Sequence, residues 1–131
     1  MVWNMNMVWG FAFSLVVGGV VAWLIMDKWL YPRIKEEFTR PDILLVAVLG
    51  AMERFMYTSC IILNVPHWVA IWPAFKALTR WRHGEGDKPR LSVRLGNMYC
   101  IGNLLTVFFG VIGGLICKYG FDIENWCILF K

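Results

Sequence analysis

The sequence has few charged residues, few histidines and few prolines for its length. Of its 131 residues, 17% are charged, two are His and five are Pro, whereas 59% are hydrophobic. A soluble domain usually carries about 25% charged and about 45–50% apolar residues. This chain could not cover its apolar side chains with polar ones in water. The composition therefore excludes an ordinary soluble domain and favours a protein whose solvent is a lipid bilayer.

Signatures of chemistry are also scarce. The sequence has no glycine-rich phosphate loop, no CxxC pair and no histidine pair of the kind that holds haem. The segment 83–87, HGEGD, has a His and two carboxylates, but three flexible ligands make a weak metal site. We therefore expect no cofactor and no metal, and an enzyme is not favoured. A disulfide between Cys117 and Cys127 is an alternative to reduced cysteines if that end faces an oxidising space.

Four apolar runs are present, over residues 7–26, 43–65, 66–81 and 95–117. At a helical rise of about 1.5 Å per residue, the first run matches a hydrocarbon core of roughly 30 Å. It lacks the basic start and small-residue cleavage site of a signal peptide, so we expect a retained helix. The third run is short and contains Pro73, so a kinked, re-entrant or interfacial helix is the competing interpretation. The sequence predicts an all-α fold, a polytopic integral membrane protein with a four-helix transmembrane bundle in one domain, 1–131.

Basic residues concentrate in two segments, and this predicts the orientation. The N-terminal end and the turn near Pro66 have no Lys or Arg, and the tail 118–131 has only Lys118 and Lys131. Cytoplasmic loops collect Lys and Arg, so we expect loops 27–42 and 82–94 in the cytoplasm and both termini outside it. The host is then a bacterial inner membrane or a plasma membrane. Because these residues flank apolar runs, we expect no nucleic-acid partner. They are Lys28, Arg33, Lys35, Arg40, Lys76, Arg80, Arg82, Lys88, Arg90 and Arg94.

Two predicted spans have small residues at every fourth position, which places them along one face of a helix. Close backbone approach through small residues drives helix association in membranes. These faces either pack the first span on the fourth within one chain or join neighbouring copies into an oligomer. The residues are Gly10, Ser14, Gly18 and Ala22 in the first run, and Gly102, Thr106, Gly110 and Gly114 in the last.

An acid and a base, Glu53 and Arg54, lie near the middle of the second run. One charge at the membrane centre costs about 2.5–3.5 kcal/mol on insertion scales, so both need partners or water. One interpretation is a buried ion pair that locks helix packing, with Tyr57 and Asn103 supplying hydrogen bonds. The other interpretation makes Glu53 a proton or cation site. Arg54 would then either adjust the proton or cation affinity of Glu53 or contact an anion.

The predicted function is a small oligomeric membrane channel or transporter for an ion or a small polar solute. Glu53, Arg54, Tyr57 and Asn103 would line the path or control it. The alternative is a non-catalytic membrane subunit or assembly factor that binds another membrane protein through the small-residue faces. A third, weaker interpretation is a membrane enzyme acting on lipid. The expected partners are the lipid bilayer and either further copies of the chain or another membrane protein.

Overall fold

The computed structural model describes residues 4–33, 43–81 and 89–121. Within these ranges the chain forms four helices and no strand, so the all-α prediction is confirmed. The first helix is followed by α3 (Ile43–Ile62), α4 (His67–Trp81) and α5 (Pro89–Tyr119). The predicted C-terminal tail lies almost wholly outside the described residues, as does the segment 83–87.

The first helix runs without a break from Met5 to Arg33. It begins with α1 (Met5–Ala12), a π-helical segment (Phe13–Val17) and α2 (Gly18–Trp23). A second π-helical segment (Leu24–Leu30) and a final 3₁₀ turn (Tyr31–Arg33) complete it. It continues past the predicted end at residue 26 because no helix breaker occurs before Pro32.

The C-termini of α3 and α5 are closed by residues in the left-handed conformation. Asn64 (φ 61°) follows α3. Its backbone N–H donates to Ile61 O at 3.2 Å, and the backbone N–H of Val65 donates to Cys60 O at 2.9 Å. These two bonds form a Schellman motif. Gly120 (φ 71°) ends α5 and donates to Ile116 O at 2.8 Å. Lys118 Nζ donates to Asn64 Oδ1 at 2.9 Å, so the two helix ends lie together.

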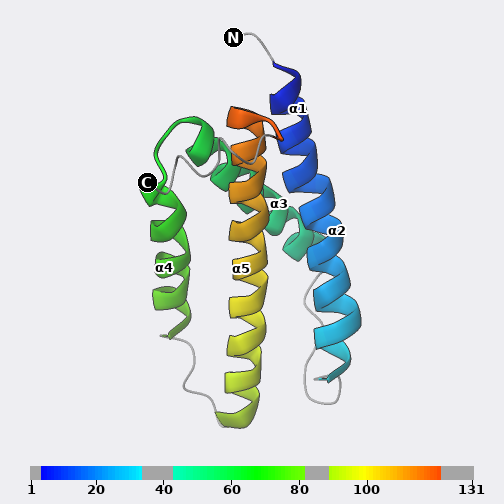
Figure 1. The fold of residues 1–131 in the computed structure, drawn as a ribbon. Coiled ribbons are helices and arrows are strands. Elements are labelled where there is room, and N and C mark those ends of the chain that lie inside the picture. Colours follow the sequence, from blue (N-terminus) through cyan, green and yellow to red (C-terminus); the bar gives the residue numbers. More distant parts are fainter. Residues whose placement is uncertain (1–3, 34–42, 82–88, 122–131) are drawn as a thin grey trace.

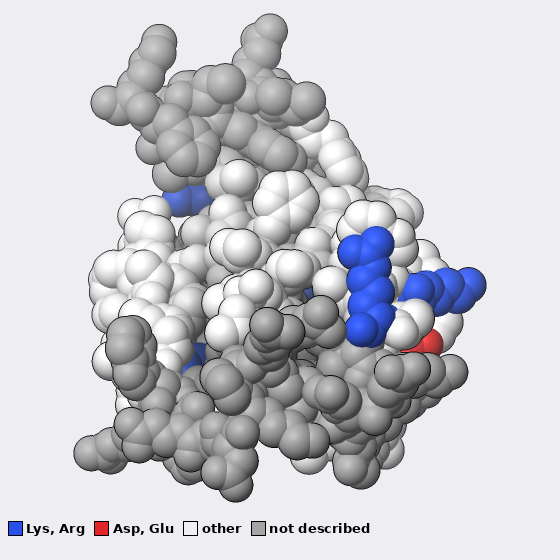
Figure 2. Space-filling model, turned by 90° about the horizontal axis from the view of Figure 1, so that it is seen from below, with Lys and Arg blue, Asp and Glu red and all other residues white. Residues whose placement is uncertain are grey.

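The helices alternate in direction along the chain (Figure 1). The start of the first helix and the end of α5 lie at one end of the bundle, where Cys117 Sγ is 3.5 Å from Met7 O. The exposed Lys28 and Arg33 lie at the other end of the first helix, where the Arg33 guanidinium is 5.1 Å from the centre of the Trp29 ring. The view from below shows Lys and Arg side chains at the surface (Figure 2). Aromatic and basic side chains together at a helix end are typical of a membrane interface.

Three helices are long and apolar enough to cross a membrane, namely those over Met5–Arg33, Leu44–Ile62 and Gly96–Tyr119. Their outward faces are apolar: Leu44 is 72% exposed, Met52 66% and Leu104 68%. Soluble monomers rarely expose contiguous apolar faces of this kind, so a membrane location is supported. α4 has 15 residues, which gives about 22 Å at helical rise, and it is not among these three.

α5 is the central helix, and its glycines set how closely its neighbours approach. A methyl group at Gly110 would lie 2.6 Å from Tyr57 Cβ, and one at Gly114 would lie 2.5 Å from Ile61 Cβ, so this row of α5 contacts α3. A methyl group at Gly113 would lie 2.6 Å from Ser14 Cβ. α5 therefore presents the row of Gly110 and Gly114 to α3, and Gly113 to the first helix.

Candidate functional site

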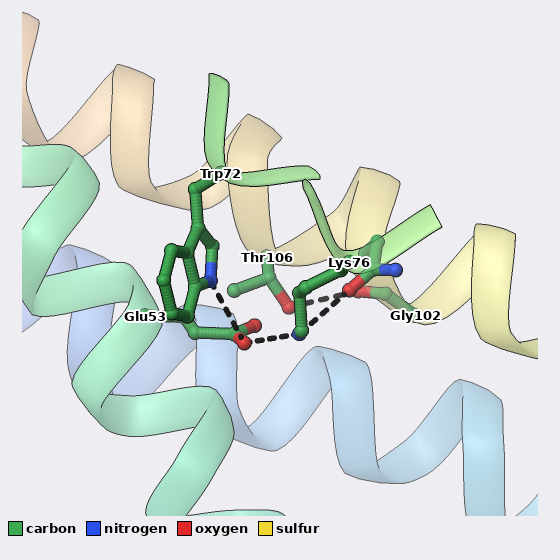
Figure 3. A network of polar contacts seen from close by, with 6 residues as sticks. Glu53, Trp72, Lys76, Gly102 and Thr106 are labelled. Carbon is green, nitrogen blue, oxygen red and sulfur yellow. Dashed lines mark hydrogen bonds and ion pairs between the residues drawn. The ribbon is translucent and has the colours of Figure 1, made fainter. Parts of the chain in front are cut away.

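The side chain of Glu53 is buried between α3, α4 and α5, with only 5% of the residue exposed. Its Oε1 atom accepts hydrogen bonds from Trp72 Nε1 at 3.4 Å and from Lys76 Nζ, with which it forms an ion pair (Figure 3). Both donors come from α4, four residues apart, and so lie on the same face of that helix. The carboxylate is thereby satisfied from a different helix rather than by its neighbour in sequence.

Lys76 connects three helices. Besides Glu53 on α3, its ammonium group donates to Asn103 Oδ1 on α5 at 3.1 Å and lies 5.5 Å from the centre of the Tyr99 ring. From the sequence alone, Lys76 is only one of the basic residues that predict the cytoplasmic side. The structure turns it inward, with 16% of the side chain exposed. The sequence gives no clear signal for this contact, because spacing along α4 does not fix how the helix is rotated toward α3.

Arg54 lies next to Glu53 in the chain but points elsewhere, since successive helical residues diverge by about 100°. It is 5% exposed, and its Nε atom has no hydrogen-bond partner. The guanidinium lies among glycines of the first helix and of α3. Methyl groups at Gly19 and Gly50 would stand 3.3 Å from Nη2 and 3.4 Å from Nη1. Among the residues that the structure describes, no ion pair between Arg54 and a carboxylate is found.

A second polar cluster, which sequence reasoning missed, joins the first helix to α3 and α5. The hydroxyls of Thr58 and Ser14 are hydrogen-bonded at 2.9 Å, and Thr58 Oγ1 donates to Gly110 O at 3.0 Å. A hydroxyl has one proton, so Thr58 accepts from Ser14 when it donates to Gly110. Both hydroxyl residues are fully buried. Thr58 is four residues after Arg54, so this cluster continues the same face of α3.

The other predicted site residues have mainly packing roles in this arrangement. Tyr57 is 1% exposed and packs on Gly110, whereas Asn103 accepts a hydrogen bond from Lys76. Thr106 Oγ1 donates to Gly102 O at 2.8 Å, within its own helix.

The remaining small residues of the two predicted faces lie between helices of one chain. A methyl group at Gly10 would collide with Cys117 and Gly113, and one at Gly18 would lie 2.7 Å from Phe109 Cβ. One at Gly102 would meet only the end of Met26, at 3.7 Å, and Ala22 is half-buried.

No cluster of three or more His, Cys, Asp or Glu side chains capable of holding a metal occurs within residues 4–33, 43–81 and 89–121. The cysteines of this part, Cys60, Cys100 and Cys117, are free thiols. The alternative partner of Cys117, Cys127, lies outside the described residues. The polar chemistry available in the described bundle is thus one carboxylate, one ammonium, one guanidinium, an amide and hydroxyls.

Comparisons with known proteins give no relative from which a role could be transferred. No family model matches the chain, and neither a curated protein nor a solved structure does.

Proposed function

We propose that the protein is a small four-span membrane channel or transporter for an ion or a small polar solute, acting as an oligomer. The observation that carries the proposal is the burial of three ionisable side chains, Glu53, Arg54 and Lys76, at the centre of a bundle with an apolar exterior. Ionisable residues inside a membrane are costly and usually mark ion or substrate pathways. Asn103 supplies a neutral polar contact to the same path.

The geometry suggests how the path could open. α4 stands to one side of α5 (Figure 1), and the polar contacts that hold it to the bundle include those of Trp72 and Lys76 with Glu53 and Asn103. Neutralising the Glu53 carboxylate removes the charge that attracts Lys76. α4 is then released toward lipid while Lys76 and Asn103 become available to a polar solute. The ion pair would thus hold the path closed until it is broken.

Four crossings, with both termini on the non-cytoplasmic side, are part of the proposal. α4 follows α3 through a tight turn at Asn64 and runs back toward the end where α5 begins (Figure 1). Its length of about 22 Å at helical rise is short, but a bilayer can thin locally around a short span. Reporter fusions at each terminus should show the same side of the membrane, and opposite sides would overturn the four-span arrangement.

The transport proposal is tested with purified protein in liposomes. A proton or solute gradient should collapse faster with the wild-type protein than in empty liposomes, and Glu53→Gln should alter that flux because its amide cannot exchange a proton. Asp27→Asn is the matched control, since it makes the same carboxyl-to-amide change near the end of the first helix. Absence of flux, with one stoichiometric membrane partner co-purifying, would instead favour the assembly-factor alternative.

A further inference from the structure

We propose that Arg54 is the binding site for a small, planar, singly charged oxyanion of the carboxylate or nitrate class, and that such an anion is the solute the protein moves. The site is the guanidinium of α3 where it lies against the glycines of the first helix. The part concerning transport rests on the proposed function, whereas binding at Arg54 does not.

The first support is the lack of a protein partner for a deeply buried cation. Arg54 is 95% buried, and its Nε–H has no acceptor. A buried donor without an acceptor forfeits its hydrogen bond to water, and the loss is larger for charged groups. Nearly every buried ionic group in a native structure has a counter-charge. An anion on the guanidinium would supply both the acceptor and the opposite charge.

The second support is the balance of charge inside the bundle. Among the described residues, the charged side chains at mid-bundle are two cations, Arg54 and the largely buried Lys76, and one carboxylate, Glu53. The carboxylate is engaged by Lys76 and Trp72 through Oε1. One carboxylate therefore faces two cations, which leaves a net positive charge in a low-dielectric interior. There, attraction for an anion is far stronger than in water.

The third support is the shape of the surroundings. Gly19 and Gly50 stand beside the two terminal nitrogens of Arg54, and side chains at either position would crowd them. The pair Gly18–Gly19 begins α2, between the π-helical segments Phe13–Val17 and Leu24–Leu30, and such segments occur frequently at functional sites. Glycine at these two positions therefore adds no side chain of its own against the terminal nitrogens.

The chemistry of the guanidinium selects among anions. Its planar fork of N–H donors matches the two oxygens of a carboxylate or nitrate, whereas a spherical halide accepts from it without that match. With only 5% of Arg54 exposed, a carboxylate carried on another protein's helix has little surface to approach. A small diffusible oxyanion needs far less access than a protein segment does.

Binding is measured first, without transport. Formate and nitrate, titrated into detergent-solubilised protein by calorimetry at constant ionic strength, should bind more tightly than chloride. Arg54→Lys keeps the charge but removes the fork, and it should weaken formate binding by about tenfold or more, as expected from a lost charge-assisted hydrogen bond. Lys28→Gln removes a charge at the membrane end and should leave binding unchanged.

A second variant guards against misfolding at Arg54. The only atom within 4 Å of a methyl group at Gly19 is Nη2 of Arg54, at 3.3 Å. Gly19→Ala should therefore keep the fold but weaken formate binding, whereas Gly96→Ala, which meets no atom within 4 Å, should not. Equal formate affinity in Gly19→Ala, Arg54→Lys and the wild type would overturn the site.

Liposome assays then separate this inference from the transport proposal. Formate or nitrate flux that is lost in Arg54→Lys supports both. Formate binding without any flux supports the site and overturns transport. Flux of another solute that needs Glu53, with no anion binding, overturns the anion site and leaves the transport proposal standing. A co-purifying protein that cross-links to Arg54 through an acidic residue would overturn the small-anion assignment in favour of a partner's carboxylate.

Discussion

The contact between α3 and α5 at Gly110 offers a direct test of the packing. In Gly110→Ala, the added methyl group would lie 2.6 Å from Tyr57 Cβ, 3.2 Å from Tyr57 Cδ2 and 3.3 Å from Arg54 O. Two of these atoms cannot move away by side-chain rotation, because one is a backbone carbonyl and the other a Cβ. α3 and α5 must therefore separate locally, and overpacking of this kind typically costs about 1–3 kcal/mol.

Gly96→Ala is the matched control, since a methyl group there meets no atom within 4 Å. Both substitutions lie in α5, so each gains about the same from replacing Gly by Ala in a helix, roughly 1 kcal/mol on peptide scales. The difference between the two variants isolates the steric term. It should therefore be about 1–3 kcal/mol, or roughly 5- to 150-fold in the unfolding equilibrium.

The assay is equilibrium unfolding in mixed micelles, with helicity followed as the fraction of denaturing detergent is raised. Gly110→Ala should unfold at a lower fraction than the wild type, and Gly96→Ala at the same or a higher one. Equal midpoints for the two variants would refute the close approach of α3 and α5 at Gly110 and, with it, the placement of Tyr57 against α5.

Two further predictions concern the polar clusters. Lys76→Met leaves the Glu53 carboxylate buried without its cation, and loss of one partner of a buried pair costs about 3–5 kcal/mol. The double variant with Glu53→Gln should recover much of this stability in the same unfolding assay. If the effects of the two substitutions on stability simply add, the pairing is contradicted. Thr58→Val deletes the hydrogen bonds to Ser14 and Gly110 at nearly constant side-chain volume. It should lower the stability by about 1 kcal/mol, since hydrogen bonds in membranes average about 0.6 kcal/mol each. An unchanged unfolding midpoint would show that these bonds do not contribute to stability.

The all-helical fold could be predicted because the length of an apolar run and the residues that interrupt it are local properties. Three apolar helices of spanning length follow directly from the runs around Gly18, Gly50 and Gly110. α4 is the exception, because its run is too short for length to decide between crossing and lying at the interface.

The partner of Glu53 could not be predicted in the same way. Spacing places residues on the faces of one helix, but it does not fix how that helix is rotated against its neighbours. Lys76 and Glu53 are 23 positions apart, and only the turn at Asn64 and the rotation of α4 bring them together. Sequence reasoning therefore considered Arg54, the adjacent charge, although adjacent helical residues diverge.

The same limitation applies to the small-residue faces. A spacing of four identified the row of Gly110 and Gly114, which contacts α3. It did not identify Gly113, which lies three residues after Gly110 and contacts Ser14. A helix that packs against two neighbours needs two such rows, and the second becomes visible only when the position of the third helix is known.

The attachment of α4 connects stability to the proposed function. Side chains such as Ile71, Phe75 and Leu78 remain at least half exposed on α4, and in a bilayer apolar burial does not drive helices together. Its position therefore depends strongly on the contacts of Lys76 and Trp72 with Glu53. A state that removes the Glu53 charge weakens this attachment while leaving the packing of α5 on α3 and on the first helix untouched. If two positions of α4 differ by only a few kcal/mol, loss of this ion pair changes their populations. The proposed path would then be controlled by the same contact that holds α4 in place.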